Sequence, residues 1–318
     1  MILVTGATGF VGNALVRRLA ADPACTGVVA AVRRKSESRP ERVQQVQVGD
    51  LLHTTDWGQA LQGVDAVVHC AARVHVMQDD ATDPLQAYRD VNVNGMLNLA
   101  RQASEAGVRR FVFVSSIKVN GEFTEVGKPF TADDVPAPED PYGVSKHEAE
   151  EVLRKFAIET GMEVVIIRPP LVYGPGVKAN FAAMMRWLAR GVPLPLAAVT
   201  ENRRSLVALD NLVDLIMTCL HHPAAANQTF LVSDGEDLST AQLLKHMGAA
   251  MGQPARLFYV SSALLKLGAT VLNKPGLYQR LCGSLQLDIA KTRQLLDWTP
   301  PVSVDEGLRR AAEGFFRP

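Results

Sequence analysis

A glycine-rich turn at the start of the chain constrains the fold more than any other feature. The opening residues, MILVTG, form an apolar run of strand length, and Gly6, Gly9 and Gly12 follow within TGATGFVG. The next stretch, FVGNALVRRLAAD, places apolar side chains at helical spacing. Glycines between a strand and a helix let the backbone turn tightly and approach a pyrophosphate, which the helix N-terminus stabilises. The pattern predicts a dinucleotide site formed by these glycines with Phe10 and Val11.

The first half of the chain alternates apolar runs with helical patterns, and this order predicts an α/β fold with a doubly wound parallel sheet, a Rossmann domain. After Arg168 the rhythm changes, and the C-terminal stretch is mainly helical. We expect the Rossmann domain to comprise residues 1–174, with 206–234 returning to it, and a smaller, mainly helical substrate lobe to comprise 175–205 and 235–318. The further strands are predicted in GVVAAVRR, VQQVQVGD, DAVVHCAA, RRFVFVSS and MEVVIIRPP.

Composition narrows the classes of partner. The formal net charge is zero, so no broad basic surface is indicated and nucleic acid is not expected. The four cysteines are scattered and form no CxxC pair, which favours a reducing, cytoplasmic location, and we expect no metal site. We expect no signal peptide and no stable membrane insertion. The partly apolar stretch SSALLKLGATVLNKPGLY is interpreted as a packed helix.

The residues after the second predicted strand bear on the choice of cofactor. Dinucleotide sites read the adenine ribose with an acid for a 2′-hydroxyl or an arginine for a 2′-phosphate. This chain has Arg33 and Arg34 in AAVRRKS and no acid there. A guanidinium can hold a phosphate bidentately, so the sequence favours NADP(H), with NAD(H) possible. Other residues expected along the cofactor are Asp50 and Leu51 after the third strand, and Ala71 and Ala72 after the fourth.

The segment DPYGVSK places Tyr142 four residues before Lys146, so the two side chains share a helix face. Pro141 suits the first turn of this helix, and Gly161 suits its end. Taken alone, the pair could equally be a solvated tyrosine and lysine on a surface helix.

The motifs together resemble an extended short-chain dehydrogenase/reductase, of the NAD-dependent epimerase/dehydratase family that acts on nucleotide sugars. The matching runs are TGATGFVG, HCAA, NVNG, FVSS, YGVSK and RPPLVYGPG. The resemblance implies that Tyr142 exchanges a proton with a sugar hydroxyl or ketone. It implies that Lys146 favours the phenolate and holds the nicotinamide ribose, and that Ser116 bonds the same substrate oxygen. It also places Ser115, Asn92 and Pro169 beside the cofactor.

Departures from the family pattern bear on the reaction. Ile117 and Lys118 stand where sugar dehydratases of this family have an Asp-Glu pair, so dehydration is disfavoured. The runs AARVHVM and GSLQLDIAKTRQLLDWTPPVSVDEGL, with the two arginines, resemble bacterial 4-reductases of UDP-4-keto-6-deoxy-N-acetylhexosamines for O-antigen synthesis. We favour this NAD(P)H-dependent reductase. A UDP-sugar 4-epimerase with tightly bound NAD is the alternative, and a non-catalytic NADP(H) sensor is remote because Tyr142 and Lys146 are both present.

Substrate contacts follow from the same resemblance. Asn180 and Arg204 match positions that hold the diphosphate, although Asn180 could instead be a helix N-cap. Asp288 could read the nucleoside or cap the next helix. The family also implies a homodimer. The residues expected at the substrate are Arg73, His75, Ser116, Lys118, Asn180, Arg204 and Asp288.

Overall fold

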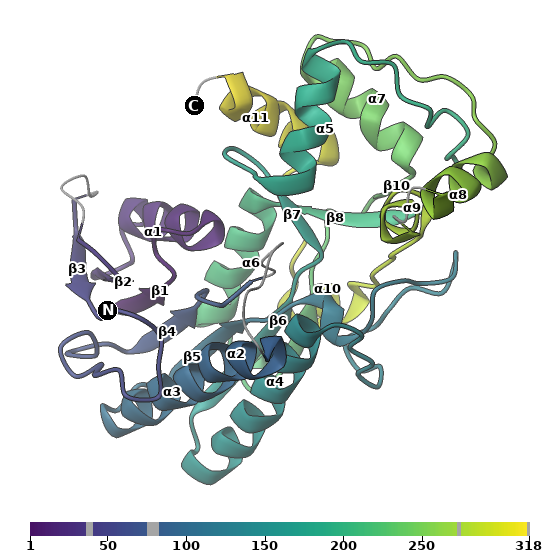
Figure 1. Cartoon of the computed structure of the whole chain (residues 1–318). Coiled ribbons are helices and arrows are strands. Elements are labelled where there is room, and N and C mark those ends of the chain that lie inside the picture. The colour runs from purple at the N-terminus through teal and green to yellow at the C-terminus, as the bar shows by residue number, and fades with distance from the viewer. Residues whose placement is uncertain (36–40, 75–82, 272–274, 317–318) are drawn as a thin grey trace.

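A computed structural model describes residues 1–35, 41–74, 83–271 and 275–316. Its centre is a parallel sheet of seven strands in the order β3-β2-β1-β4-β5-β6-β9 (Figure 1). This order confirms the predicted doubly wound Rossmann sheet of an α/β protein. The strands are β1 (Ile2–Thr5), β2 (Val28–Val32), β3 (Val43–Gln47), β4 (Ala66–His69), β5 (Arg110–Val114), β6 (Glu163–Arg168) and β9 (Thr229–Leu231).

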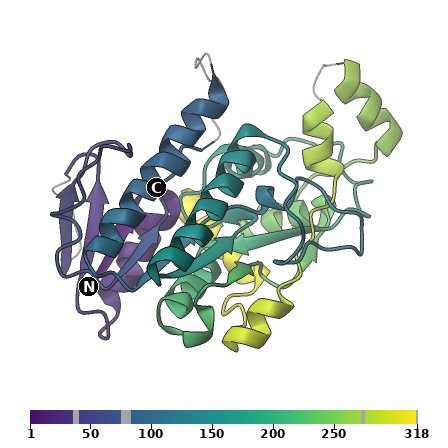
Figure 2. The same ribbon diagram turned by 90° about the horizontal axis from the view of Figure 1, so that it is seen from below.

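Alternate residues of the strands feed two separate cores, one on each face of the sheet. In β1, Val4 joins the core under α1 (Phe10–Ala21) and α6 (Leu209–His221). The neighbouring Leu3 joins the core under α3 (Met96–Glu105) and α4 (Pro141–Thr160). Both residues are fully buried, as expected for a parallel sheet with helices on both faces. Figures 1 and 2 show these two helical layers.

The second layer contains the predicted catalytic helix, α4 (Pro141–Thr160). Its start and end confirm the sequence signals, because the Asp140 side chain accepts from the Gly143 N–H and Gly161 closes the helix at φ 74°. Such caps satisfy N–H and C=O groups that have no partner inside a helix. The other elements of this layer are α2 (Pro84–Arg89), a π-helical turn η1 (Asp90–Gly95) and α3 (Met96–Glu105).

The smaller C-terminal lobe has its own core and a three-stranded sheet in the order β10-β8-β7. The elements are β7 (Leu171–Tyr173), α5 (Ala179–Ala189), β8 (Arg204–Ala208), β10 (Asp237–Leu238), α7 (Thr240–Ala250), α8 (Ser262–Val271), α9 (Pro275–Cys282), α10 (Ala290–Leu296) and α11 (Val304–Phe316), with short 3₁₀ turns η2 (Ile117–Val119) and η3 (Pro223–Ala225) elsewhere. Helices α5, α7, α8, α9 and α11 pack beyond the carboxyl ends of the large sheet, whereas α10 packs beside its edge strand β9 (Figure 1). The predicted domain boundaries stay a prediction.

One expectation for this lobe is wrong. The stretch SSALLKLGATVLNKPGLY forms parts of two helices, and α8 contains no buried residue. It is therefore not the fully packed helix that its apolar side chains predicted, because α8 meets the core of this lobe through the partly buried Leu265. Among the described residues, no helix is both long and apolar enough to cross a membrane.

Candidate active site

Ser116, Tyr142 and Lys146 come together at the carboxyl ends of β4 and β5, where open α/β sheets bind their ligands. Ser116 directly precedes η2, and its hydroxyl accepts from the Lys118 N–H at 3.3 Å. The same hydroxyl lies beside the phenol of Tyr142, in the first turn of α4, and lowers the pKa of that phenol. Lys146 follows one turn later on the same helix. The structure thus joins the two hydroxyls that the sequence selected.

The Lys146 ammonium is buried beneath this pair. Its Nζ donates to the Val114 carbonyl at 2.9 Å and lies 4.4 Å from the centre of the Phe113 ring. Burial lowers the pKa of Lys146 to about 8, and the nearby Glu150 carboxylate acts in the opposite direction. The protonation of a buried lysine of this kind depends on the charges of its neighbours.

The phenol of Tyr142 is held in its protonated form by the protein around it. Burial raises its pKa most, and the negative charge of Asp140 raises it further. The neighbouring Ser116 hydroxyl lowers it. A base at this position therefore needs positive charge close to the phenol oxygen.

Glu150 lies one turn beyond Lys146 and binds three side chains from separate elements. Its carboxylate accepts from Ser115 at 2.6 Å, from Arg154 at 2.8 Å, and from Arg168 at 2.9 and 2.6 Å. Burial alone would raise the pKa of this carboxyl, but the Arg168 guanidinium more than offsets it, so the pKa is lowered. A permanent negative charge thus faces Lys146 from inside the protein.

The glycine turn fits a dinucleotide pyrophosphate. Gly6 adopts a left-handed conformation at φ 63°, and a Cβ on Gly12 would lie 2.2 Å from the Gly6 carbonyl oxygen. Only glycine tolerates both demands. Helix α1 starts after Gly9 without a side-chain cap, so the N–H groups at its start, from Phe10 onward, can receive an anion.

Asn92 fastens the segment after β4 to the catalytic helix. Its Oδ1 accepts from the Arg73 N–H at 2.8 Å, and its Nδ2 donates to the Arg73 carbonyl and to the Ser145 hydroxyl. Asn92 is buried in the π-helical turn η1, a distortion common at functional sites. The amide therefore fixes the place of Arg73 relative to α4.

Comparison with known proteins agrees with this geometry. Residues 2–233 match the family model described as the NAD dependent epimerase/dehydratase family. A UDP-glucose 4-epimerase of Vibrio cholerae is 48% identical over 99% of this chain and 95% of its own length. The chain belongs to the NAD dependent epimerase/dehydratase family. This membership confirms the predicted resemblance, and the protein is an enzyme.

Two further relatives show the range of this epimerase/dehydratase family. An N-acetyl-alpha-D-glucosaminyl-diphospho-ditrans,octacis-undecaprenol 4-epimerase of Escherichia coli O157:H7 is 28% identical over 99% of this chain and 95% of its own. The solved structure of MoeE5 with UDP-glucuronic acid and NAD is 25% identical, with a TM-score of 0.78 over 99% of both chains.

The remaining residues that the sequence predicts at the cofactor differ in their exposure to solvent. Arg33, Arg34 and Asp50 are exposed. Pro169 is buried, and its carbonyl accepts from the Ile117 N–H at 3.0 Å, which holds the segment after Ser116. The partly buried members are Phe10, Val11, Leu51, Ala71 and Ala72.

The predicted substrate residues are not all brought together. Arg204 is partly buried and donates to the Gly283 carbonyl at 3.1 Å. Asp288 is exposed, and its carboxylate accepts from the Ala290 N–H at the start of α10. Asn180 is exposed within α5, whose cap position is Lys178, so the alternative reading of Asn180 as an N-cap is wrong. His75 lies outside the described residues.

The ion pairs of Lys118 argue against the predicted contact with the substrate. Its ammonium pairs with Glu122 at 2.6 Å and also with Asp140. Asp140 is the N-cap of α4 and raises the pKa of Tyr142. Lys118 therefore offsets the negative charge nearest to the phenol and ties the Ser116 turn to the catalytic helix.

Sequence reasoning missed two buried side chains at this site. Tyr88 packs edge-on against the Tyr142 ring at 6.1 Å between centroids, with the Arg73 guanidinium 5.6 Å from its own ring centre. His69 ends β4 and lies 3.0 Å from the Thr5 hydroxyl, and burial lowers its pKa to about 3. His69 begins the HCAA motif at the end of a predicted strand, so the sequence could have placed it near the site. No motif in the sequence pointed to Tyr88.

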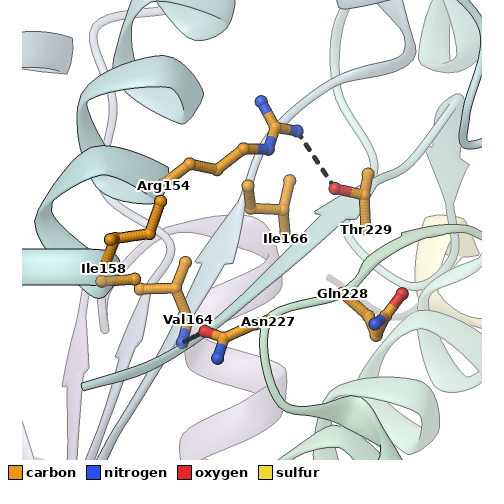
Figure 3. A pocket seen from close by; sticks show the side chains of 8 residues that line it. Arg154, Ile158, Val164, Ile166, Asn227, Gln228 and Thr229 are labelled. Carbon is orange, nitrogen blue, oxygen red and sulfur yellow. Dashed lines mark hydrogen bonds between the residues drawn. The ribbon is translucent and has the colours of Figure 1, made fainter. Parts of the chain in front are cut away.

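A hollow of about 280 Å³ lies at the far side of the Glu150 network (Figure 3). Arg154 reaches into it and donates to the Thr229 hydroxyl at 3.1 Å, while Asn227 accepts from the Val164 N–H at 3.0 Å. It opens beside the amino ends of β6 and β9, away from Ser116. None of the sequence-predicted site residues lines it.

Proposed function

We propose that this enzyme is a nucleotide-sugar 4-epimerase that acts on a UDP-sugar and retains NAD between turnovers. The observation that carries the proposal is the 48% identity to the Vibrio cholerae UDP-glucose 4-epimerase over nearly the whole of both chains. This proposal takes the alternative from the sequence in place of the favoured 4-reductase. The reductase reading rested on two arginines and short local runs, which weigh less than similarity along the entire chain.

NAD is the cofactor that this proposal requires, in place of the NADP(H) favoured from the sequence. The family is named for NAD, and the MoeE5 structure holds NAD beside a UDP-sugar. Arg33 and Arg34 are exposed at the end of β2, which is compatible with a solvated basic turn. The turn of Gly6, Gly9 and Gly12 would hold the pyrophosphate of NAD, and the bound nicotinamide would supply a reversible hydride acceptor for the sugar.

In this mechanism Tyr142 transfers the proton of the sugar hydroxyl, and Ser116 binds the oxygen of that hydroxyl. The Tyr142 phenolate takes the proton of the C4 hydroxyl as that carbon is oxidised. The Ser116 hydroxyl, which lies beside the phenol, donates to the same sugar oxygen and holds it in place. After the keto sugar presents its other face, Tyr142 returns the proton, so the enzyme ends as it began. Lys146, charged and buried, favours the phenolate.

The two residues that follow Ser116 support epimerisation over dehydration. Elimination of water needs an acid and a base beside the substrate. Ile117 is buried and aliphatic, and the Lys118 ammonium is occupied by Glu122 and Asp140. Neither can perform that step.

Product analysis tests the proposal. Purified enzyme is incubated with UDP-glucose or UDP-N-acetylglucosamine, and the C4 epimers are resolved by NMR while absorbance near the NADH band is recorded. We expect interconversion without net change of cofactor. Consumption of NADH or NADPH in step with UDP-2-acetamido-2,6-dideoxy-4-hexulose, with no epimer formed from either UDP-sugar, would replace this proposal by the 4-reductase.

Several sequence-based expectations remain predictions. We propose a homodimer, a cytoplasmic location and a two-lobe division at residues 174–175, 205–206 and 234–235. Light scattering of the purified protein tests the first, and limited proteolysis tests the last. A role in O-antigen synthesis depends on which UDP-sugar the enzyme prefers.

A further inference from the structure

Helix α8 presents an apolar face to solvent. Leu264, Leu267 and Val271 are spaced three and four residues apart, so they share one face, and they are 60, 60 and 77% exposed. Leu265 lies on the opposite side and packs against the core of the smaller lobe. The helix therefore has two apolar faces, and the part of the chain that the structure describes covers only one of them. A face of this kind marks an interaction site more often than it marks a free surface.

The exposed face continues into the segment before the helix. Phe258 and Tyr259 are 48 and 75% exposed. Figures 1 and 2 both show α8 and α9 at the rim of the molecule, away from the seven-stranded sheet. Two aromatic residues thus adjoin three aliphatic ones at a projecting edge.

The charge of this region is one-sided. The chain as a whole has 33 acidic and 33 basic residues, yet none of the residues 238–287 is acidic and five are Lys or Arg. Four of these five are exposed, namely Lys245, Arg256, Lys266 on α8 and Arg280 on α9, and Lys274 lies outside the described residues. The acids Glu122 and Glu125 of the loop that contacts the end of α9 are each paired with a lysine. The apolar face is therefore flanked by positive charge.

We propose that α8, with Phe258 and Tyr259, docks the enzyme reversibly on an anionic lipid surface. A helix lying in the membrane interface inserts apolar side chains below the headgroups while lysine and arginine meet anionic lipids, and aromatic rings occupy the boundary. The ten residues of α8 span about 15 Å, so the helix can lie on a bilayer but cannot cross it.

A second copy of the chain fits this face less well. A two-fold interface places the same patch on both sides. Lys266 and Arg280 would then approach their own copies with no acid from residues 238–287 to pair with. Like charges across an interface are unfavourable, whereas an anionic membrane complements both.

Docking at α8 would hold the substrate side of the enzyme near the membrane. Helix α9 leads directly to Gly283, whose carbonyl accepts from Arg204 and from Asn202. The eleven positions 272–282 thus separate the end of α8 from Gly283, the hydrogen-bond partner of Arg204, which the family resemblance places at the diphosphate. The docking proposal rests on exposure and charge, and it stands independently of the proposed epimerase reaction.

Vesicle co-sedimentation of the full-length enzyme tests the proposal. Vesicles of phosphatidylcholine with about 30 mol% phosphatidylglycerol are compared with pure phosphatidylcholine at low and high salt. We expect binding to the anionic vesicles that weakens with salt. In the double variant Leu264→Glu/Leu267→Glu the partition coefficient should fall about tenfold or more, because two charges enter the apolar face.

The control carries the same two charges elsewhere. Ile158→Glu/Val135→Glu alters residues that are each 86% exposed on other elements, and it should bind vesicles as the unaltered enzyme does. Both double variants should turn over a soluble UDP-sugar at the unaltered rate, which separates this test from that of the reaction. No sedimentation with anionic vesicles, or equal loss in the control, would overturn the proposal. So would a dimer that the Leu264→Glu/Leu267→Glu variant dissociates with unchanged vesicle binding.

Discussion

Two tyrosine hydroxyls lie in contrasting regions, the start of α4 and the junction between the two sheets. Burial raises the pKa of both Tyr142 and Tyr173. The neighbour of Tyr142 is the Ser116 hydroxyl, which lowers the pKa. The partner of Tyr173 is the Asp234 carboxylate at 2.7 Å, which raises it. A phenol beside a hydroxyl can exchange its proton, whereas a phenol bonded to a carboxylate is a fixed donor.

The buried carboxylates of the two regions differ in the same way. Glu150, behind the catalytic helix, binds the guanidinium groups of Arg168 and Arg154, and its pKa is lowered. Among the described residues, Asp234 accepts hydrogen bonds only from neutral donors, the Ala208 N–H, the Asn211 amide and the Tyr173 hydroxyl, and burial raises its pKa. In the first region the Glu150 carboxylate stays charged near Lys146. In the second region the buried Asp234 is held by hydrogen bonds from neutral groups.

The largest effect that the comparison predicts is on turnover in Tyr142→Phe. Removing the phenol oxygen removes the acid/base group, so kcat should fall by about 10² or more. NAD affinity, measured by fluorescence titration, should be nearly intact, and Tm should change little because the partly exposed ring remains. Unchanged kcat would refute the acid/base assignment.

Glu150→Gln should separate the electrostatic role of the first region from its packing. The change leaves the Arg168 guanidinium buried without its counter-charge, which should cost about 3 kcal/mol of unfolding free energy in urea. Because Glu150 raises the pKa of Lys146, the alkaline limb of kcat/KM against pH should also move to lower pH.

Glu148→Gln is the matched control for this substitution. Glu148 lies on the same helix and pairs with Arg89 at a partly exposed position. Its loss should leave the alkaline limb in place and cost under about 1 kcal/mol. If Glu148→Gln and Glu150→Gln shift the pH profile alike, the specific link between Glu150 and Lys146 is wrong.

Tyr173→Phe makes the same chemical change as Tyr142→Phe in the second region. It removes one donor from Asp234 within a buried cluster, so we expect a loss of about 1–2 kcal/mol in unfolding free energy. The turnover of the folded enzyme should be unchanged, since Tyr173 bonds Asp234 and is fully buried. A fall in kcat as large as that of Tyr142→Phe would remove the contrast between the two tyrosines.

The sequence predicted those features that depend on local spacing. The glycine turn, the cap and stop of α4 and the shared face of Tyr142 and Lys146 all follow from residues close together along the chain. The doubly wound parallel sheet also followed, because alternating strands and helices leave few topologies.

Features that depend on contacts between distant segments could not be predicted. Tyr88 meets Tyr142 across 54 positions of the numbering, and two partners of Glu150, Ser115 and Arg168, lie outside its helix α4. The exposed face of α8 was misread because an apolar helix does not reveal from sequence whether a neighbour covers it. Whether Asn180 is an N-cap likewise depended on the residue at which α5 begins.

The smallest predicted effect is that of Asp234→Asn, and its sign distinguishes the two carboxylates. Asparagine can accept from Ala208 and Asn211 and donate to the Tyr173 oxygen, so the cost should be under about 1 kcal/mol at neutral pH. Because the folded pKa of Asp234 is raised above 3.8, its protonated form contributes stability that is present below that pH and is lost as pH rises through the folded pKa.

The two amide variants should therefore respond to pH in opposite directions when urea unfolding is followed from about pH 3 to 7. The deficit of Asp234→Asn relative to the unaltered enzyme should shrink as pH rises. Glu150 has a lowered pKa, so its contribution is present above the unfolded value and lost as pH falls, and the deficit of Glu150→Gln should shrink in acid. Parallel pH dependence in both variants would mean that guanidinium pairing does not distinguish these two buried carboxylates.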